Sequence, residues 1–361
     1  MSASNETILH VDLKKLEQNF VFLKRKLQPK TKIIGVVKAY AYGHGDIMVS
    51  KKLEKLDFDA LWVSDFEEGV NLRKSGVKLK IIVANPGLKS YNEIIKYKLD
   101  VIIYNQKLLN LYCSKKNNVN IHLKFNTGMN RYGFNHSDLK LIASKIKQNP
   151  HLNLLSTCSH LAASNHEGKK EDNLKQISKF KFMCKNLELL LEKKIDRHIL
   201  NSNGLVNFPE HQMEGVRLGI GLYGLNNKEG LKQISSLYSV ITQIRNIKKG
   251  DSIGYGKSHI VNGKIKIAIV PVGYADGINR SLGKNRGSVF VNNIECNIIG
   301  EISMDSFAIN INHINNIKEG DVVEIFGKNM AISKIAKKIN TIPYEIYSTL
   351  NRRIKRVYSD S

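Results

Sequence analysis

A lysine stands at the end of a strand-like apolar run in the sequence IIGVVKAYAYGHG, residues 33 to 45. The run is rich in β-branched residues, and Lys38 follows it directly. A charged side chain in such a place has a chemical use, because burial makes a lysine amine lose its proton more easily. A neutral amine is a nucleophile that forms a Schiff base with an aldehyde. Lys38 is therefore the first candidate for covalent chemistry.

Other polar residues follow the ends of later strand-like runs. Serine beside the glycine-rich sequence GIG suits a phosphate, because exposed backbone N–H groups approach anions closely there. Together with a lysine, a histidine and an arginine, this set predicts a site for a phosphorylated, electron-poor ligand. Pyridoxal phosphate is an aldehyde that also carries a phosphate. The candidate residues are Lys124, Arg131, His160, Asn201, Ser202, Arg217 and Gly219.

The elements that must position these residues alternate between strands and helices from Lys32 to about Leu225. Short β-branched runs such as KIIGVVKA alternate with helical periods such as GDIMVSKKLEKL, and this alternation is typical of a parallel sheet. About eight strand–helix steps predict an α/β fold, a TIM-type (β/α)8 barrel, whose active site lies at the carboxyl ends of its strands. A doubly wound open sheet fits the same pattern.

The pattern changes after about Asn227. Strand-like runs such as KIKIAIVPVGYADG and DVVEIFG are separated by short turns, and no long helix intervenes before AISKIAKKI. We therefore predict two domains, a barrel over residues 8–227 and a mainly-β domain over residues 228–361. Residues 1–12 precede the barrel and could pair with the second sheet.

The composition excludes several classes of protein. The formal net charge is +24 in 361 residues, but the lysines are spread over the chain without a nucleic-acid-binding motif, so we favour solvated helix faces over nucleic-acid binding. An anionic small molecule still finds a favourable electrostatic field.

No apolar run reaches the ~20 residues of a membrane span. The scattered cysteines argue against a zinc site or a disulfide framework, and the polar N-terminus lacks a secretory pattern, which predicts a cytoplasmic protein.

The sequence VVKAYAYGHG resembles the pyridoxal-phosphate signature of bacterial alanine racemases. The sequences KFNTGMNRYGF, SHLA, NSNG, VRLGIGLYG, SIGYGKS, PVGYADG, ISMDS and IPYEI follow in that family's order, so the resemblance spans nearly the full chain. It implies an isomerase that interconverts L- and D-alanine by a two-base mechanism on a pyridoxal-phosphate aldimine and supplies D-alanine for peptidoglycan.

The resemblance also implies the two bases. Lys38 would hold the cofactor as an internal aldimine and act on one face of the substrate's α-carbon. Tyr255 in GYGKS would act on the opposite face, reaching in from the partner subunit of a homodimer. Two bases on opposite faces suit racemisation, because one removes the α-proton and the other replaces it. The pattern of residues alone does not favour Tyr255 over Tyr274.

The remaining roles follow from the same resemblance. Arg217 would contact the pyridine nitrogen, and His160 would support Arg217 and link it to Tyr255. Because a guanidinium keeps its proton, it limits how far the ring acts as an electron sink. Arg131 and the backbone of the partner's Met304 would hold the substrate carboxylate, and Lys124 matches a lysine that can be carbamylated. Tyr274 and Asp305 match residues at the entrance. The rest of the cofactor-binding set would be Tyr42, Asn201, Ser202, Gly219, Ile220 and Tyr344.

Two positions depart from the family pattern. Tyr40 stands where asparagine is usual, beside the site, and Asn126 stands where aspartate is usual, near Lys124. Neither removes a catalytic group, but both leave substrate preference and the modification of Lys124 open.

Simpler interpretations exist for each residue taken singly. Lys38 could be a strand-end lysine, His160 a hydrogen-bonded core histidine, and Asn201 and Ser202 cap residues. The competing functions are a racemase of serine or lysine, a barrel-fold amino-acid decarboxylase, and a non-enzymatic cofactor-binding barrel. The decarboxylases place an acidic residue where Arg217 stands, and the small barrels lack the β domain that carries Tyr255.

Overall fold

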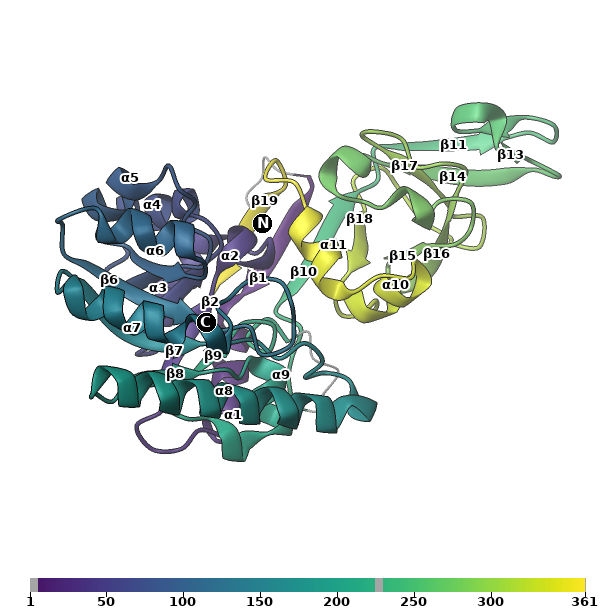
Figure 1. The fold of residues 1–361 in the computed structure, drawn as a ribbon. Coiled ribbons are helices and arrows are strands. Elements are labelled where there is room, and N and C mark those ends of the chain that lie inside the picture. The colour runs from purple at the N-terminus through teal and green to yellow at the C-terminus, as the bar shows by residue number, and fades with distance from the viewer. Residues whose placement is uncertain (1–5, 225–229, 361) are drawn as a thin grey trace.

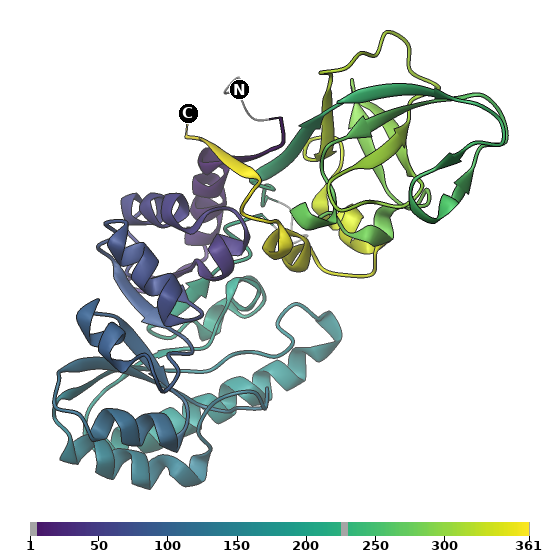
Figure 2. The same cartoon turned by 90° about the horizontal axis from the view of Figure 1, so that it is seen from above.

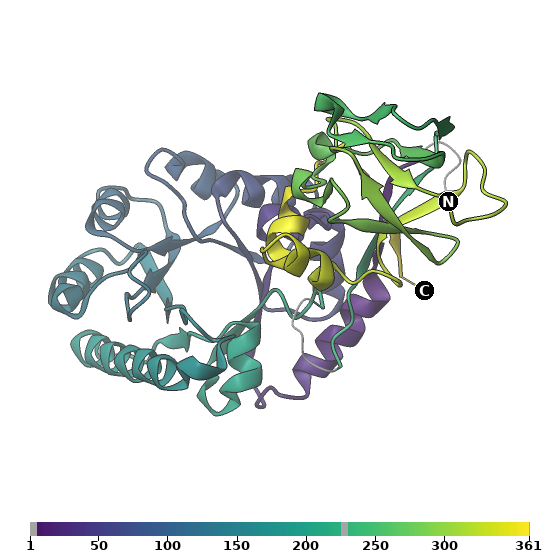
Figure 3. The ribbon, with the colours of Figure 1, turned by 90° about the vertical axis from the view of Figure 1, so that its right-hand side faces the viewer.

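The computed structural model describes residues 6–224 and 230–360, and parallel strands form a nearly closed ring in the first of these ranges (Figure 3). The strand order is β8-β7-β6-β5-β4-β3-β2-β9. A single parallel bridge between Asn201 and Arg217 connects the two end strands. The predicted (β/α)8 barrel is confirmed, and the open doubly wound sheet is wrong. The strands are β2 (Lys32–Val36), β3 (Ala60–Val63), β4 (Lys80–Val83), β5 (Asp100–Ile103), β6 (Val119–Lys124), β7 (Leu152–Cys158), β8 (Asp196–His198) and β9 (Gly215–Leu218).

Helices cover the outside of this ring. Their apolar residues recur on one face, as in the helix after β6, which buries Leu139, Ile142, Ala143 and Ile146 at helical spacing. The helix before β2 packs beside the helix after β8. Among the described residues, none of the helices is long and apolar enough to cross a membrane. The barrel's helices are α1 (Leu13–Lys24), α2 (Lys38–Tyr42), α3 (Asp46–Lys55), α4 (Phe66–Lys74), α5 (Tyr91–Lys96), α6 (Gln106–Cys113), α7 (Leu139–Gln148), α8 (Lys170–Leu191) and α9 (Ser202–Asn207).

The second half of the chain folds into a nine-stranded sheet with the order β11-β14-β17-β16-β15-β18-β10-β1-β19, beside the barrel (Figure 2). A separate two-stranded ribbon, β12 with β13, projects at its far end (Figure 1). Two helices, α10 (Ile332–Lys338) and α11 (Pro343–Thr349), complete it, and α11 packs against α2 of the barrel. The strands are β10 (Ser235–Val240), β11 (Gln243–Ile247), β12 (Ser252–Ile253), β13 (His259–Ile260), β14 (Ile265–Val270), β15 (Ser288–Val291), β16 (Ile294–Ile299), β17 (Phe307–Asn310), β18 (Val322–Phe326) and β19 (Lys355–Ser359).

The first strand of the chain belongs to this second sheet. Strand β1 (Ile8–Asp12) pairs antiparallel with β10 and parallel with β19. Both ends of the described chain therefore lie in one sheet and tie the two halves together. The proposed division at residues 227 and 228 falls within 225–229, outside the described residues, and stays a prediction.

Candidate active site at the mouth of the barrel

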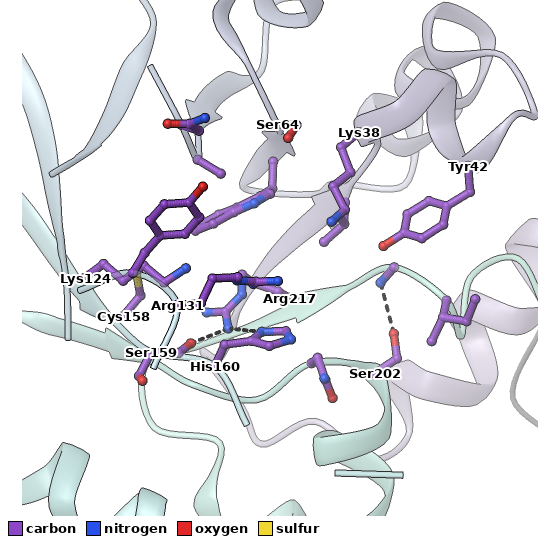
Figure 4. Close-up of a pocket in the computed structure, with 18 of the residues that line it drawn as sticks. Lys38, Tyr42, Ser64, Lys124, Arg131, Cys158, Ser159, His160, Ser202 and Arg217 are labelled. Carbon is purple, nitrogen blue, oxygen red and sulfur yellow. Dashed lines mark hydrogen bonds between the residues drawn. The ribbon is translucent and has the colours of Figure 1, made fainter. Parts of the chain in front are cut away.

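A pocket of about 450 Å³ opens at the carboxyl ends of the barrel strands (Figure 4). Most of its lining comes from the loops and turns that directly follow the strands, as the barrel architecture requires. Tyr344 is the exception, because it reaches the pocket from α11 of the second half of the chain. Among the residues that line the pocket are the predicted Lys38, Tyr42, Lys124, Arg131, His160, Asn201, Ser202, Arg217, Gly219, Ile220 and Tyr344.

The side chain of Lys38 projects into this pocket from the start of α2 (Figure 4). Strand β2 ends at Val36, one residue before the end of the apolar run at Val37. Burial lowers the pKa of Lys38, and the positive charge of Arg131 lowers it further, while Glu68 acts in the opposite direction. The shift favours the neutral amine, which is the nucleophilic form.

Helix α2 is a turn of left-handed helix. Ala39, Tyr40 and Ala41 have φ of 51°, 57° and 51°, and Tyr42 continues at 52°. Such backbone is costly for residues other than glycine, so the surroundings must hold it in place. The Ala39 N–H donates to Glu68 Oε1 at 2.6 Å. This turn places Lys38 and Tyr42 on the same pocket.

Arg217 is buried at the floor of the pocket and its terminal nitrogens are fully engaged. Nη1 donates to the carbonyl of His198 at 3.0 Å, and Nη2 donates to the carbonyls of Ser159 at 2.6 Å and Ile199 at 3.1 Å. The guanidinium also lies 5.2 Å from the ring of Trp62. These contacts fix a permanent positive charge in one orientation.

His160 is neutral beside this arginine. Burial lowers its pKa well below the usual range, and the charge of Arg217 is the next largest cause. Arg217 Nη2 lies 3.4 Å from His160 Nδ1 (Figure 4). Because a guanidinium only donates, Nδ1 is the acceptor and the proton of the ring is on Nε2.

The opposite end of the pocket offers hydroxyl donors. Burial raises the pKa of Tyr344 to about 12 and raises the pKa of Tyr42 further, so both phenols keep their protons. Their rings lie 5.9 Å apart. A Cβ at Gly219 would lie 3.1 Å from the Tyr42 hydroxyl, so glycine keeps this cradle open. Ser202 Oγ accepts from the Gly219 N–H at 2.9 Å. The set fits a phosphate group.

Asn201 has a local structural role. Its side-chain oxygen caps α9 by accepting from the Gly204 N–H at 2.8 Å, and it also accepts from the Ser164 hydroxyl at 3.0 Å. A direct contact from Asn201 to a cofactor therefore stays a prediction.

A second lysine lies across the pocket. Burial lowers the pKa of Lys124, and the charges of Arg217 and Arg131 contribute in the same direction. A neutral amine is the form that carbamylation would need, so the lowered pKa is compatible with that prediction. The side chain of Asn126 instead organises its own loop, accepting from the Asn130 N–H at 3.0 Å.

Four predicted residues do not line the pocket of their own chain. Tyr255 is 72 % exposed and follows β12, Met304 is 53 % exposed, and Tyr274 is 42 % exposed. Asp305 pairs with Arg353 at 2.7 Å. The Met304 carbonyl accepts from the N–H of the residue after Tyr274, so Tyr274, Met304 and Asp305 form one exposed cluster on the second sheet.

Sequence reasoning missed several lining residues. Trp62, Ser64 and Asn85 lie at or after the ends of the second and third barrel strands, and Cys158 ends the sixth. The same rule that selected Lys38 would have selected them, because every strand of a barrel ends at the mouth. Tyr132 also lines the pocket, with Lys124 5.6 Å from its ring.

The fold and the site define a class of protein: a barrel enzyme that combines a lysine amine of lowered pKa with donors for a phosphorylated ligand. Two family models match the chain, "Alanine racemase, N-terminal domain" over residues 11–227 and "Alanine racemase, C-terminal domain" over residues 234–358. The chain belongs to the alanine racemase family.

Individual relatives agree over nearly the full length. The alanine racemase of Clostridium tetani is 34 % identical over 369 residues, covering 96 % of this chain and 94 % of its own. A solved alanine racemase from Clostridium difficile 630 superposes with a TM-score of 0.93 at 31 % identity, covering 100 % and 97 % of the two chains. One from Bartonella henselae, with covalently bound pyridoxal phosphate, has a TM-score of 0.88 at 26 % identity, covering 98 % and 99 %.

Proposed function

We propose that this chain interconverts L-alanine and D-alanine with pyridoxal phosphate bound at the barrel mouth. The observation that carries the proposal is the pairing of the half-buried amine of Lys38, with its lowered pKa, and the phenol and glycine cradle of Tyr42, Gly219 and Tyr344 in one pocket. An amine and a phosphate cradle are the two features that a phosphorylated aldehyde needs. Relatives support the substrate class, since the Clostridium difficile enzyme is known in complex with cycloserine.

The chain's own residues would divide the work between binding and proton transfer. When bound, pyridoxal phosphate supplies an electron-poor ring that makes the α-proton of an amino acid more acidic. Lys38 would hold the cofactor and exchange a proton on one face of the α-carbon, and Tyr255 of a second chain would do so on the other. The two groups approach the α-carbon from opposite sides. Protonation by Lys38 and protonation by Tyr255 would therefore give opposite enantiomers of alanine.

Arg217 would limit how much charge the cofactor ring withdraws. Its guanidinium is buried and keeps its proton, so a ring nitrogen beside it stays an acceptor. His160, neutral with its proton on Nε2, would orient Arg217 and link it toward Tyr255. Arg131 would hold the substrate carboxylate together with the backbone of the partner's Met304, and Tyr274 and Asp305 of the second chain would line the entrance.

We further propose a homodimer in the cytoplasm. Tyr255, Tyr274 and Met304 are exposed and lie outside the chain's own pocket, which fits side chains that complete the site of a second copy. The cysteines are unpaired, which suits a reducing compartment. The D-alanine formed would serve peptidoglycan synthesis.

Two variants test the proposal. Lys38→Ala should abolish the visible absorbance of protein-bound cofactor, because no other proposed group holds it covalently. Tyr255→Phe should keep that absorbance but slow α-proton exchange from L-alanine by about 10²–10⁴-fold, the usual contribution of a general acid or base. Exchange is followed by proton NMR in D2O. Unchanged absorbance in Lys38→Ala would refute the proposed attachment.

A further inference from the structure

A chain of buried polar groups runs from Arg217 down the inside of the barrel, beneath the pocket. It consists of His198 on β8, Ser156 on β7, His122 on β6 and Asp100 on β5, each at most 5 % exposed. None of these four side chains lines the pocket. Since buried polar groups are costly unless they are satisfied, their alignment toward one active-site residue calls for an explanation.

Hydrogen bonds connect Arg217, His198, Ser156 and His122, and Asp100 lies just beyond hydrogen-bond distance of the last. Arg217 Nη1 donates to His198 Nδ1. His198 Nε2 lies 3.0 Å from Ser156 Oγ, and the same hydroxyl lies 2.7 Å from His122 Nδ1. His122 Nε2 faces Asp100 Oδ2 at 3.6 Å, beyond hydrogen-bond distance, and neither atom has a hydrogen-bond partner among the described residues. A register shift in the pairing of β6 and β7 places His122 opposite Ser156, so a local irregularity of the barrel brings the two side chains together.

Arg217 fixes the direction of every hydrogen bond in this series. A guanidinium only donates, so His198 Nδ1 is unprotonated and the proton of the neutral ring is on Nε2, directed at Ser156. The Ser156 hydroxyl accepts from His198 and therefore donates to His122 Nδ1, so the proton of a neutral His122 is on Nε2, which faces the Asp100 carboxylate. Ser156 can do both, because a hydroxyl has one proton and two lone pairs.

We propose that Ser156, His122 and Asp100 are positioning residues that hold His198 in its Nε2–H tautomer and thereby keep the Arg217 guanidinium aligned with the pocket. The other tautomer would set an N–H of His198 against an N–H of Arg217 and break their contact. Burial lowers the pKa of His198 well below its usual range, with the charge of Arg217 as the next cause, so the ring is neutral. The position of its one ring proton therefore decides whether Nδ1 can accept from Arg217. The expected effect on cofactor binding rests on the proposed function, whereas the expected tautomers of the two histidines do not.

The first test reads the tautomers directly in the cofactor-free full-length protein. Histidine labelled with ¹⁵N and ¹³C in the ring gives NMR shifts that distinguish the two neutral tautomers and the imidazolium form. His198→Gln and His122→Gln assign the two signals. We expect a single ring N–H, on Nε2, for both residues. A protonated Nδ1 on His198, or a doubly protonated His122, would overturn the proposal.

The second test asks whether His122 and Asp100 act on His198 through Ser156, an arrangement that we call the relay. Ser156→Ala removes the acceptor of the buried His198 Nε2–H, so part of the population should shift to the other tautomer at the expense of the contact with Arg217. Pyridoxal phosphate binding should weaken about three- to tenfold, the value of one hydrogen bond. Ser156→Thr keeps a hydroxyl and should keep both readouts. Ser50→Ala is the matched control, because Ser50 is buried in α3 and its hydroxyl has no partner in the described part of the chain. An unchanged His198 tautomer in Ser156→Ala would refute the relay, whatever the cofactor affinity.

Discussion

The charged side chains that line the pocket are lysines and arginines. Lys38, Lys124, Arg131 and Arg217 line it, and the described lining contains no aspartate or glutamate. Burial lowers the pKa of both lysines, and neighbouring cations lower it further. The two arginines therefore stay charged and attract anions, while the lysine amines are shifted toward the neutral form. A phosphate and a carboxylate are the groups that such a site binds best.

A single substitution separates the effect of a neighbouring cation on the pKa of Lys38 from the effect of burial. Because Arg131 lowers the pKa of Lys38, Arg131→Gln should raise it, so that the neutral amine appears only at higher pH. The rate at which pyridoxal phosphate attaches to cofactor-free protein, followed by visible absorbance, should then rise at higher pH than in the wild type. Arg25→Gln, which changes the net charge by the same amount at the end of α1, is the control. The midpoint is the pH at which the attachment rate reaches half of its maximum. If this pH stays fixed or falls in Arg131→Gln, the electrostatic account is contradicted.

At the scale of the element, the left-handed turn α2 links the pocket to the second half of the chain. Tyr40 stands where the resemblance leads one to expect asparagine, a residue that tolerates positive φ better. Its ring does not line the pocket. It lies 4.7 Å from the guanidinium of Arg352 and 5.2 Å from that of Arg356. Arg356 also donates to the Gly43 carbonyl at 3.0 Å. Cation–π contacts thus offset part of the strain.

Two substitutions at Tyr40 should differ in thermal stability. Tyr40→Ile loses the ring and places a β-branched residue at positive φ, which should cost about 1–2 kcal/mol more than Tyr40→Asn. The difference amounts to a few degrees in Tm. Differential scanning calorimetry of the cofactor-free protein measures it. Equal melting temperatures for the two variants would show that the turn is not strained at this position.

Much of the barrel and of its pocket is predictable from short stretches of sequence. Each barrel strand is a compact β-branched run, and each strand ends at the mouth of the barrel. That rule found Lys38, His160 and Arg217. It could not find the left-handed turn, because Ala39 to Ala41 contain no glycine and the conformation depends on Glu68 and on arginines about 300 residues away. It could not find the His122 and Ser156 pair either, since a register shift decides which side chains meet.

At the scale of the whole molecule, one chain supplies only part of the proposed site. The second half of the chain sends Tyr344 into its own pocket through α11, which packs on α2. It leaves Tyr255, Tyr274 and Met304 exposed elsewhere. If these residues complete the site of a second copy, activity belongs to the assembly and not to the chain. Closed symmetric dimers are the commonest way to share a site.

Mixing two inactive variants tests this central claim most directly. Lys38→Ala and Tyr255→Phe each lack one of the two proposed bases, so each homodimer should fail to racemise alanine. After subunit exchange, verified with differently tagged chains, a mixed dimer holds one site with both bases. Equal amounts should then recover about a quarter of wild-type activity if exchange is random, measured by the optical rotation of L-alanine. No recovery in verified mixed dimers would contradict a site shared between Lys38 of one chain and Tyr255 of another.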